Sequence, residues 1–172
     1  MPEVLTSWIG APRPAEAWLW IGAWLLAFEV LKRAFWRFAL ISMAGTVLHE
    51  AAHFLVGLCV GAGPRSFEIW PKRSAKGWTL GSVDFVRLNW INAAPAALAP
   101  LLLLPVGLFS LDAWIVPAVE RGLHGRAAFF GWIAASCLRS FWPSPQDWSL
   151  CRGSLAAWIL GAAILLGLSL AI

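Results

Sequence analysis

The sequence predicts an all-α polytopic membrane protein with about five transmembrane helices and a small β-hairpin or sheet at the membrane surface. Of its 172 residues, 60% are hydrophobic and only 13% are charged, whereas an ordinary soluble domain is about 25% charged. The chain also contains 13 tryptophans and no tyrosine, and indole side chains favour the headgroup zone of a bilayer. One span needs roughly 20 apolar residues, so residues 1–172 are expected to form a single integral-membrane domain.

The composition also excludes several classes of protein. The mean hydropathy of +0.72 excludes intrinsic disorder, and the net charge of +4 is ascribed to basic residues that flank the spans, so no nucleic-acid partner is expected. Cys59, Cys137 and Cys151 form no CxxC pair and are odd in number. Neither a disulfide framework nor a cysteine zinc cluster is therefore predicted.

The first two spans are predicted at about 17–31 and 38–60. Lys32 and Arg33 follow the first apolar run, and the second run stops at the Gly-Ala-Gly-Pro sequence of residues 61–64. Glycine and proline in this arrangement end a helix, so the chain is expected to leave the membrane there.

A β element is predicted at about 65–88, directly after the second span. This segment is richer in charge than the rest of the chain, and its apolar residues are interspersed with polar ones. Pro71 and Gly77 are placed at its bend. The pattern favours a hairpin or small sheet at the membrane surface.

Three further spans are predicted at about 89–111, 126–142 and 148–172. The first of them carries no Asp, Glu, Lys or Arg, and neighbouring helices can satisfy the backbone groups that its prolines leave unpaired. A loop is expected at 112–125, and the Pro-Ser-Pro sequence of residues 143–145 separates the last two spans.

The motif His49-Glu50-Ala51-Ala52-His53 lies within the second predicted span. Histidines at i and i+4 share one face of a helix, so both imidazoles can bind one metal ion. Zinc suits two imidazoles and an oxygen ligand, and Glu50 can then act as general base on a zinc-bound water. Incidental polar residues are the alternative, but chance produces such a motif in this composition with a probability of roughly 0.002. Ionisable residues in the middle of a span are also costly and are functional candidates by default. One Zn²⁺ per chain is predicted.

Asp147 is the predicted third metal ligand. Successive spans alternate in direction, which places the break at 143–148 on the side of the membrane where the second span ends. A segment dipping inward there would bring Asp147 to His53, whereas Glu120 and His124 fall on the opposite side. The alternative role for Asp147 is to stabilise a helix N-terminus through the helix dipole, and the two roles are compatible.

Two asparagines, Asn89 and Asn92, enter the third predicted span at the level of the metal site. An amide there can donate to a substrate or to a developing oxyanion, or it can make an ordinary interhelical hydrogen bond. The hairpin around residues 79–85 likewise has two readings. It either adds an unwound substrate segment as an extra strand or forms a surface lid without substrate contact.

These features together resemble the site-2 protease family of intramembrane zinc metalloproteases. The resemblance covers roughly residues 38–160 and rests on the HExxH motif in a span, the amphipathic β segment after it and the late aspartate at the start of another span. It indicates a compact, minimal relative and implies that His49, His53 and Asp147 hold zinc and that Glu50 is catalytic. The implied function is hydrolysis of peptide bonds in membrane-embedded or membrane-adjacent protein substrates, so the expected partners are such a protein or peptide and the lipid bilayer.

Two other functions remain open at this point. A non-catalytic zinc-binding membrane protein, such as a chaperone or sensor, would not require Glu50. A metal transporter would carry ionisable residues stepped through the bilayer, but this sequence has one cluster at one depth. Most of the Lys and Arg residues lie on the side of the predicted site, so the site is expected to face the cytoplasm, in the cytoplasmic membrane of a prokaryote. The oligomeric state is left open.

Overall fold

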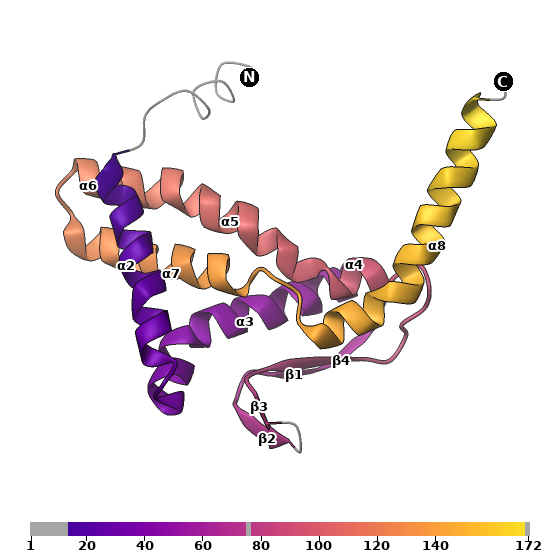
Figure 1. Ribbon diagram of the computed structural model, residues 1–172, viewed down its shortest axis with the longest axis horizontal. Helices are drawn as coiled ribbons and strands as arrows, with labels where there is room; N and C mark the ends of the chain where they lie inside the picture. The colour runs from indigo at the N-terminus through magenta and orange to yellow at the C-terminus, as the bar shows by residue number, and fades with distance from the viewer. Residues whose placement is uncertain (1–13, 75–76, 171–172) are drawn as a thin grey trace. The chain divides into compact units, whose positions relative to one another are not determined.

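The computed structural model describes residues 14–74 and 77–170, and these form a mostly helical structure with a small β element (Figure 1). In chain order the elements are α2 (Ala15–Leu31), α3 (Phe35–Cys59), β1 (Pro64–Glu68), β2 (Lys72–Ser74), β3 (Gly77–Thr79), β4 (Ser82–Phe85), α4 (Ala93–Ala97), the 3₁₀-helix η1 (Ala99–Leu102), α5 (Leu103–Ser110), the π-helix η2 (Leu111–Ile115), α6 (Val116–Glu120), α7 (His124–Ser140) and α8 (Pro145–Leu170). The predicted combination of helices with a small β element is therefore confirmed.

The described part of the chain forms two compact units. The first contains residues 14–45 and 103–139, and the second contains residues 46–74, 77–102 and 140–170. The boundaries fall within α3, between η1 and α5, and at the end of α7.

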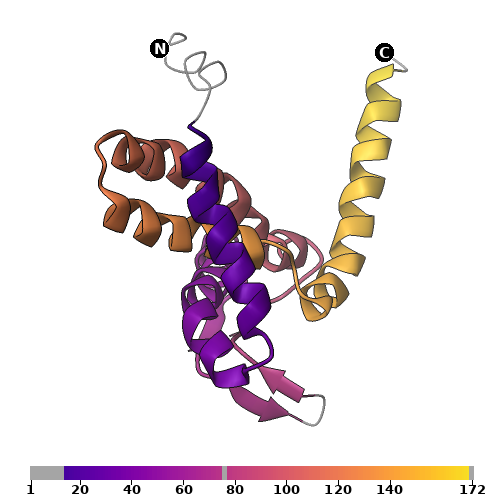
Figure 2. The ribbon, with the colours of Figure 1, turned by 60° about the vertical axis from the view of Figure 1, so that its left-hand side comes forward.

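The first unit is a helical cluster in which small residues allow close packing. Its core contains the buried side chains of Phe28, Leu111 and Ile115 together with alanines of α6 and α7. Gly107 of α5 lies against Cys137 of α7, where a Cβ on the glycine would be 3.1 Å from the Cys137 Cβ. The two helices accordingly run side by side in Figures 1 and 2.

The third predicted span, 89–111, is displaced toward the C-terminus. The helical run begins at Ala93 and continues through α5, η2 and α6 to Glu120, so the loop predicted at 112–125 is wrong over most of its length. A charge such as Asp112 marks the end of an apolar segment, whereas a helix ends only where its backbone hydrogen bonds end. The charge of Asp112 therefore made the predicted end of this helical run too early.

Within the described residues, two helices are long and apolar enough to cross a membrane. They are α3 and the run Ala99–Glu120, and 28% and 33% of their most apolar stretches are buried. Helices are also present in the other segments predicted as spans, at 17–31, 126–142 and 148–172, as α2, α7 and α8, and residues 171–172 of the last prediction lie outside the described part of the chain. A total of five spans stays a prediction.

The second unit begins with the part of α3 that carries the histidines, and α3 ends in a glycine cap. Gly61 adopts a φ of +71°, which L side chains rarely reach, and Ala62 N–H donates to the Gly57 carbonyl (2.8 Å). This pair of features is typical of a Schellman motif. It confirms the break predicted at 61–64.

The β element of the second unit consists of two two-stranded antiparallel sheets. β1 pairs with β4 and β2 pairs with β3, with Pro71 at the interruption between β1 and β2. The strands lie within residues 64–85, which confirms the β element predicted at about 65–88. Phe85 of β4 packs on Gly57 of α3, where a Cβ on the glycine would fall 2.4 Å from the Phe85 ring. The hairpin is thereby fixed against the helix that carries the motif.

Candidate metal centre

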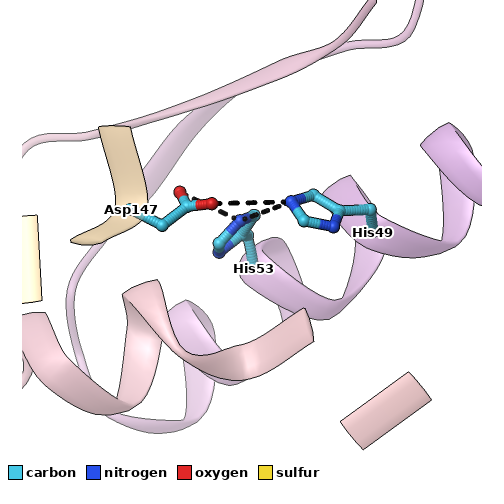
Figure 3. Close-up of side chains that lie close together, drawn as sticks. All are labelled: His49, His53 and Asp147. Carbon is cyan, nitrogen blue, oxygen red and sulfur yellow. Dashed lines mark hydrogen bonds and ion pairs between the residues drawn. The ribbon is translucent and has the colours of Figure 1, made fainter. Parts of the chain in front are cut away.

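The HExxH residues lie one helical turn apart on α3, as their spacing predicts. The rings of His49 and His53 have centroids 4.9 Å apart, and their Nε2 atoms are 3.2 Å apart. His53 is 4% exposed. Two imidazole nitrogens therefore meet at one buried point of the helix surface (Figure 3).

Asp147, in the first turn of α8, completes the group (Figure 3). Its Oδ1 lies 3.3 Å from His53 Nε2 and its Oδ2 lies 3.6 Å from His49 Nε2. One ligand atom from each residue lies within 4.8 Å of the other two, and this group could hold a metal ion. The structure thus brings together the three residues predicted as ligands.

Asp147 is itself held by a reciprocal capping box at the start of α8. Ser144 N–H donates to Asp147 Oδ2 (2.6 Å), and Asp147 N–H donates to the Ser144 hydroxyl (3.2 Å). Pro145 occupies the first helical position, where its missing N–H leaves no donor unpaired. Asp147 therefore lies in the first turn of a helix, as its alternative reading expected, and it accepts a capping hydrogen bond there in addition to its contacts with the histidines.

Backbone carbonyls orient both histidines. His49 Nδ1 lies 2.6 Å from the Ser140 carbonyl oxygen, and His53 Nδ1 lies 2.8 Å from the Ala96 carbonyl oxygen. A carbonyl can only accept, so each Nδ1 is the donor. In a neutral imidazole the Nε2 atom is then an acceptor, and these are the atoms that face one another. Metal-binding histidines are commonly held in this way.

This donor set fits a small cation. With both Nε2 atoms unprotonated, the two imidazole lone pairs and the carboxylate would all face one small space, where a cation would be attracted to each of them. In a tetrahedral site with ligand distances of about 2.0–2.1 Å, neighbouring ligand atoms are about 3.4 Å apart. The nearest pairs here are separated by 3.2, 3.3 and 3.6 Å.

Glu50 is 8% exposed and lines the same cavity as the three candidate ligands. The hairpin approaches it closely at Gly81, between β3 and β4. A Cβ on Gly81 would lie 2.7 Å from Glu50 Cγ, 2.9 Å from Glu50 Oε1 and 2.9 Å from Thr46 Cγ2. Only a glycine lets the hairpin backbone reach this position beside the carboxylate.

An open cavity of about 1010 Å³ gives access to the site. Its walls come from α3, from the hairpin and from the start of α8, and every lining residue belongs to the second unit. They are Thr46, His49, Glu50, His53, Trp78, Thr79, Leu80, Gly81, Ser82, Val83, Phe85, Ala97, Ser140, Trp142, Ser144, Pro145, Gln146, Asp147, Ser149 and Leu150. The metal-ligand group, Glu50 and one side of the hairpin therefore share one space.

Asn89 and Asn92 form the turn that precedes α4. Asn89 Oδ1 accepts from the N–H groups of Ile91 (2.8 Å) and Asn92 (3.0 Å), and Asn92 Oδ1 accepts from Asn89 N–H (2.8 Å). Asn92 Nδ2 donates to the Arg87 carbonyl (2.9 Å). These bonds are local, and neither asparagine lines the cavity. Their predicted role toward a substrate stays a prediction.

Sequence reasoning missed the residues that hold the ligands. Ala96 and Ser140 act through main-chain carbonyls, which every residue type possesses, so their identity carries no signal. Their neighbours do carry one. Pro100 follows Ala96 by four residues, and Ser140 ends α7 before the Pro-Ser-Pro sequence. Ser144 with Asp147 also forms a recognisable S-x-x-D capping pattern.

In comparisons with known proteins, no family model, curated protein or solved structure matches this chain. The chemistry of the site therefore has to be inferred from its own residues.

Proposed function

We propose that this protein is an intramembrane zinc metalloprotease that hydrolyses peptide bonds of membrane-embedded or membrane-adjacent protein substrates. The observation that carries the proposal is the position of Glu50. Glu50 lines the same open cavity as His49, His53 and Asp147, the group that could hold a metal ion. A site that only stores or senses a metal has no use for a second carboxylate at this place.

The donor set supports zinc, with one ion per chain. Two imidazole nitrogens and one carboxylate are a common catalytic zinc set, and they leave a fourth position open. Zinc bound there would supply Lewis acidity, which makes water acidic near neutral pH and polarises a carbonyl group.

Glu50 moves the proton in the proposed reaction. It accepts a proton from the attacking water as the C–O bond forms at the scissile carbonyl carbon. It then gives this proton to the amide nitrogen as the C–N bond breaks, so a free carboxyl and a free amine result. His49, His53 and Asp147 keep their orientations throughout, because each is fixed by a backbone group.

The hairpin is the proposed place for the substrate backbone. Ser82, Val83 and Phe85 of β4 line the cavity, and an extended segment can pair with an open strand edge. This binding mode suits the chemistry, because a peptide bond inside a helix is shielded from attack.

The membrane is the proposed environment, with five spans, in the cytoplasmic membrane of a prokaryote and with the site toward the cytoplasm. Support comes from the two candidate spans and from apolar side chains exposed along α2, α3 and α5, such as Leu19, Leu40 and Val106. Such side chains are stable in contact with lipid.

The decisive experiment measures zinc content and cleavage separately. Full-length protein is purified, reconstituted in liposomes and assayed against a single-span membrane protein substrate. Wild type is expected to hold one zinc and to cleave. His49→Ala is expected to lose both properties, and Glu50→Gln to keep zinc but to lose cleavage by at least about 100-fold.

Glu68→Gln is the matched control, since Glu68 lies in β1 with an exposed side chain that pairs with Lys72. It is expected to behave as wild type. Cleavage that survives Glu50→Gln would refute the mechanism. Stoichiometric zinc without cleavage in wild type would favour a non-catalytic chaperone or sensor instead.

A further inference from the structure

Two prolines remove backbone donors from the region of α4. Pro95 lies inside α4 and Pro100 lies in η1, directly after it. A proline has no N–H, so no backbone donor at its position can bond to the carbonyl four residues before it. The carbonyls concerned are those of Ile91, which is exposed, and Ala96, which is buried, and a buried carbonyl needs a partner.

Side chains from neighbouring helices bond to both carbonyls. Trp158 Nε1 of α8 donates to the Ile91 carbonyl (3.1 Å), and His53 Nδ1 of α3 donates to the Ala96 carbonyl (2.8 Å). The second bond is deeply buried, because Ala96 is 0% and His53 is 4% exposed. At Pro95 the carbonyl without a backbone donor thus accepts from a tryptophan, and at Pro100 it accepts from one of the candidate metal ligands.

We propose that Pro100 is a positioning residue of the metal centre, because it keeps the Ala96 carbonyl free of an N–H donor and available to His53. The bond from His53 Nδ1 fixes the tautomer of this imidazole. Its Nε2 lone pair then faces His49 and Asp147, as a metal ligand requires. The inference rests on the metal site of the proposed function and is independent of protease activity.

An N–H at position 100 would compete for the Ala96 carbonyl. His53 would then lose the acceptor that holds its Nδ1 proton, and the proton could move to Nε2, where it blocks the metal. Loss of such an orienting bond typically weakens metal binding by about 10- to 100-fold. The ring of Pro100 is also fully buried, so a test has to separate the N–H from packing.

Two variants of the full-length protein differ only in the backbone N–H at position 100. Pro100→Ala removes the ring and introduces an N–H. Its ester analogue, with lactic acid at position 100, removes the ring equally but introduces no N–H. Pro95→Ala is the matched control, because it introduces an N–H that competes with Trp158 and not with a ligand.

Two measurements are made on each variant. Zinc affinity is measured by competition with a chelator, and the tautomer of His53 is read from imidazole ¹⁵N shifts of the metal-free protein, which has three histidines. Pro100→Ala is expected to bind zinc about 10- to 100-fold more weakly than the ester analogue and to lose the Nδ1–H form of His53. The ester analogue and Pro95→Ala are expected to keep both properties of wild type.

The proposal is overturned if Pro100→Ala and the ester analogue weaken zinc binding equally, or if neither changes the His53 tautomer. If wild type binds no zinc, the proposed function fails, but the tautomer comparison still decides this inference. If Pro100→Ala does not fold, lactic acid at position 97 makes the Ala96 carbonyl a poorer acceptor while Pro100 stays. The same loss of zinc affinity and of the Nδ1–H form is then expected, and its absence would overturn the proposal.

Discussion

At the scale of single residues, the candidate site is held by main-chain atoms. The Ser140 and Ala96 carbonyls fix the two imidazoles, and the Ser144 N–H fixes the carboxylate of Asp147. If the site binds an ion, these main-chain contacts would set the separations between the candidate ligand atoms before binding.

Ser144→Ala removes the hydroxyl that accepts from Asp147 N–H. Stability is expected to fall by about 1 kcal/mol, as for the loss of an N-cap, and zinc binding is expected to weaken because Asp147 is less firmly placed. Ser144→Thr keeps the hydroxyl and should keep both properties. Denaturant unfolding and chelator competition check this prediction.

The control for Ser144→Ala is Ser149→Ala, because the exposed Ser149 hydroxyl donates to the Gln146 carbonyl and to no proposed ligand. Equal zinc affinities of the two alanine variants would contradict a role for the capping box in the site.

Gly81→Ala introduces a Cβ where Glu50 and Thr46 already lie. Glu50 is expected to be displaced, so cleavage should fall by about 100-fold while zinc content stays at one per chain. Gly153→Ala is the matched control, since nothing lies within 4 Å of a Cβ on Gly153. Unchanged cleavage in Gly81→Ala, or loss of its zinc, would refute the proposed arrangement.

How well the sequence predicts each part of this site depends on how far apart in the chain the residues concerned lie. His49, Glu50 and His53 follow from the period of one helix, which is local. Asp147 was predicted from the alternation of spans; the structure brings it to His49 and His53, and the alternation itself stays a prediction. The contacts of the histidines with the Ser140 and Ala96 carbonyls depend on tertiary packing, and the identities of these two residues do not reveal them.

At the scale of elements, the helices and the hairpin were predictable because apolar runs and breakers alternate clearly. The helix that carries the motif ended as expected at Gly61, where a positive φ excludes most residues. The failure came at Asp112, because helical hydrogen bonding continues past a charge to Glu120. The irregular start at Asn89 was also missed, since the side chains of that turn bond to its own backbone.

The packing of the hairpin on α3 depends on Gly57 and Phe85. Gly57→Ala is expected to lower stability by about 1–3 kcal/mol, because the added methyl group meets the aromatic ring. Phe85→Leu in the same chain should restore part of the loss, so the two effects should not add. Gly22→Ala serves as control, as a Cβ there meets nothing within 4 Å. Additive effects measured by denaturant unfolding would argue against this contact.

At the scale of the whole molecule, the proposed ligands come from segments far apart in the chain. His49 and His53 lie in α3, and Asp147 lies in α8. A bound ion would therefore act as a crosslink between them, and metal binding should be visible as stability of the folded protein.

Zinc is expected to raise the free energy of unfolding by about 2.7 kcal/mol at a free concentration 100 times its Kd. A chelator should reverse the effect. His53→Ala should show no response to either addition, because a ligand is missing. Thermal unfolding in detergent with zinc or EDTA tests this, and an equal zinc response in His53→Ala would place the ion elsewhere.

The orientation of the molecule can be tested with its own cysteines. Cys59, at the end of α3, is exposed, whereas Cys137 and Cys151 are buried. A membrane-impermeant maleimide is expected to label the protein in inside-out vesicles and not in right-side-out vesicles. Cys59→Ser should abolish the label. Labelling from the outer side would reverse the proposed topology.

The dependence of the site on main-chain carbonyls has a consequence for mutational scans. A substitution at Ser140 leaves its carbonyl in place, so a saturation scan would record this position as tolerant although it holds His49. At Pro100 the same scan would record sensitivity in a residue that never touches the ion, because every other residue type brings an N–H. A position that tolerates substitution can therefore still be important for the site. A map of the site built from side-chain replacements alone would miss such positions.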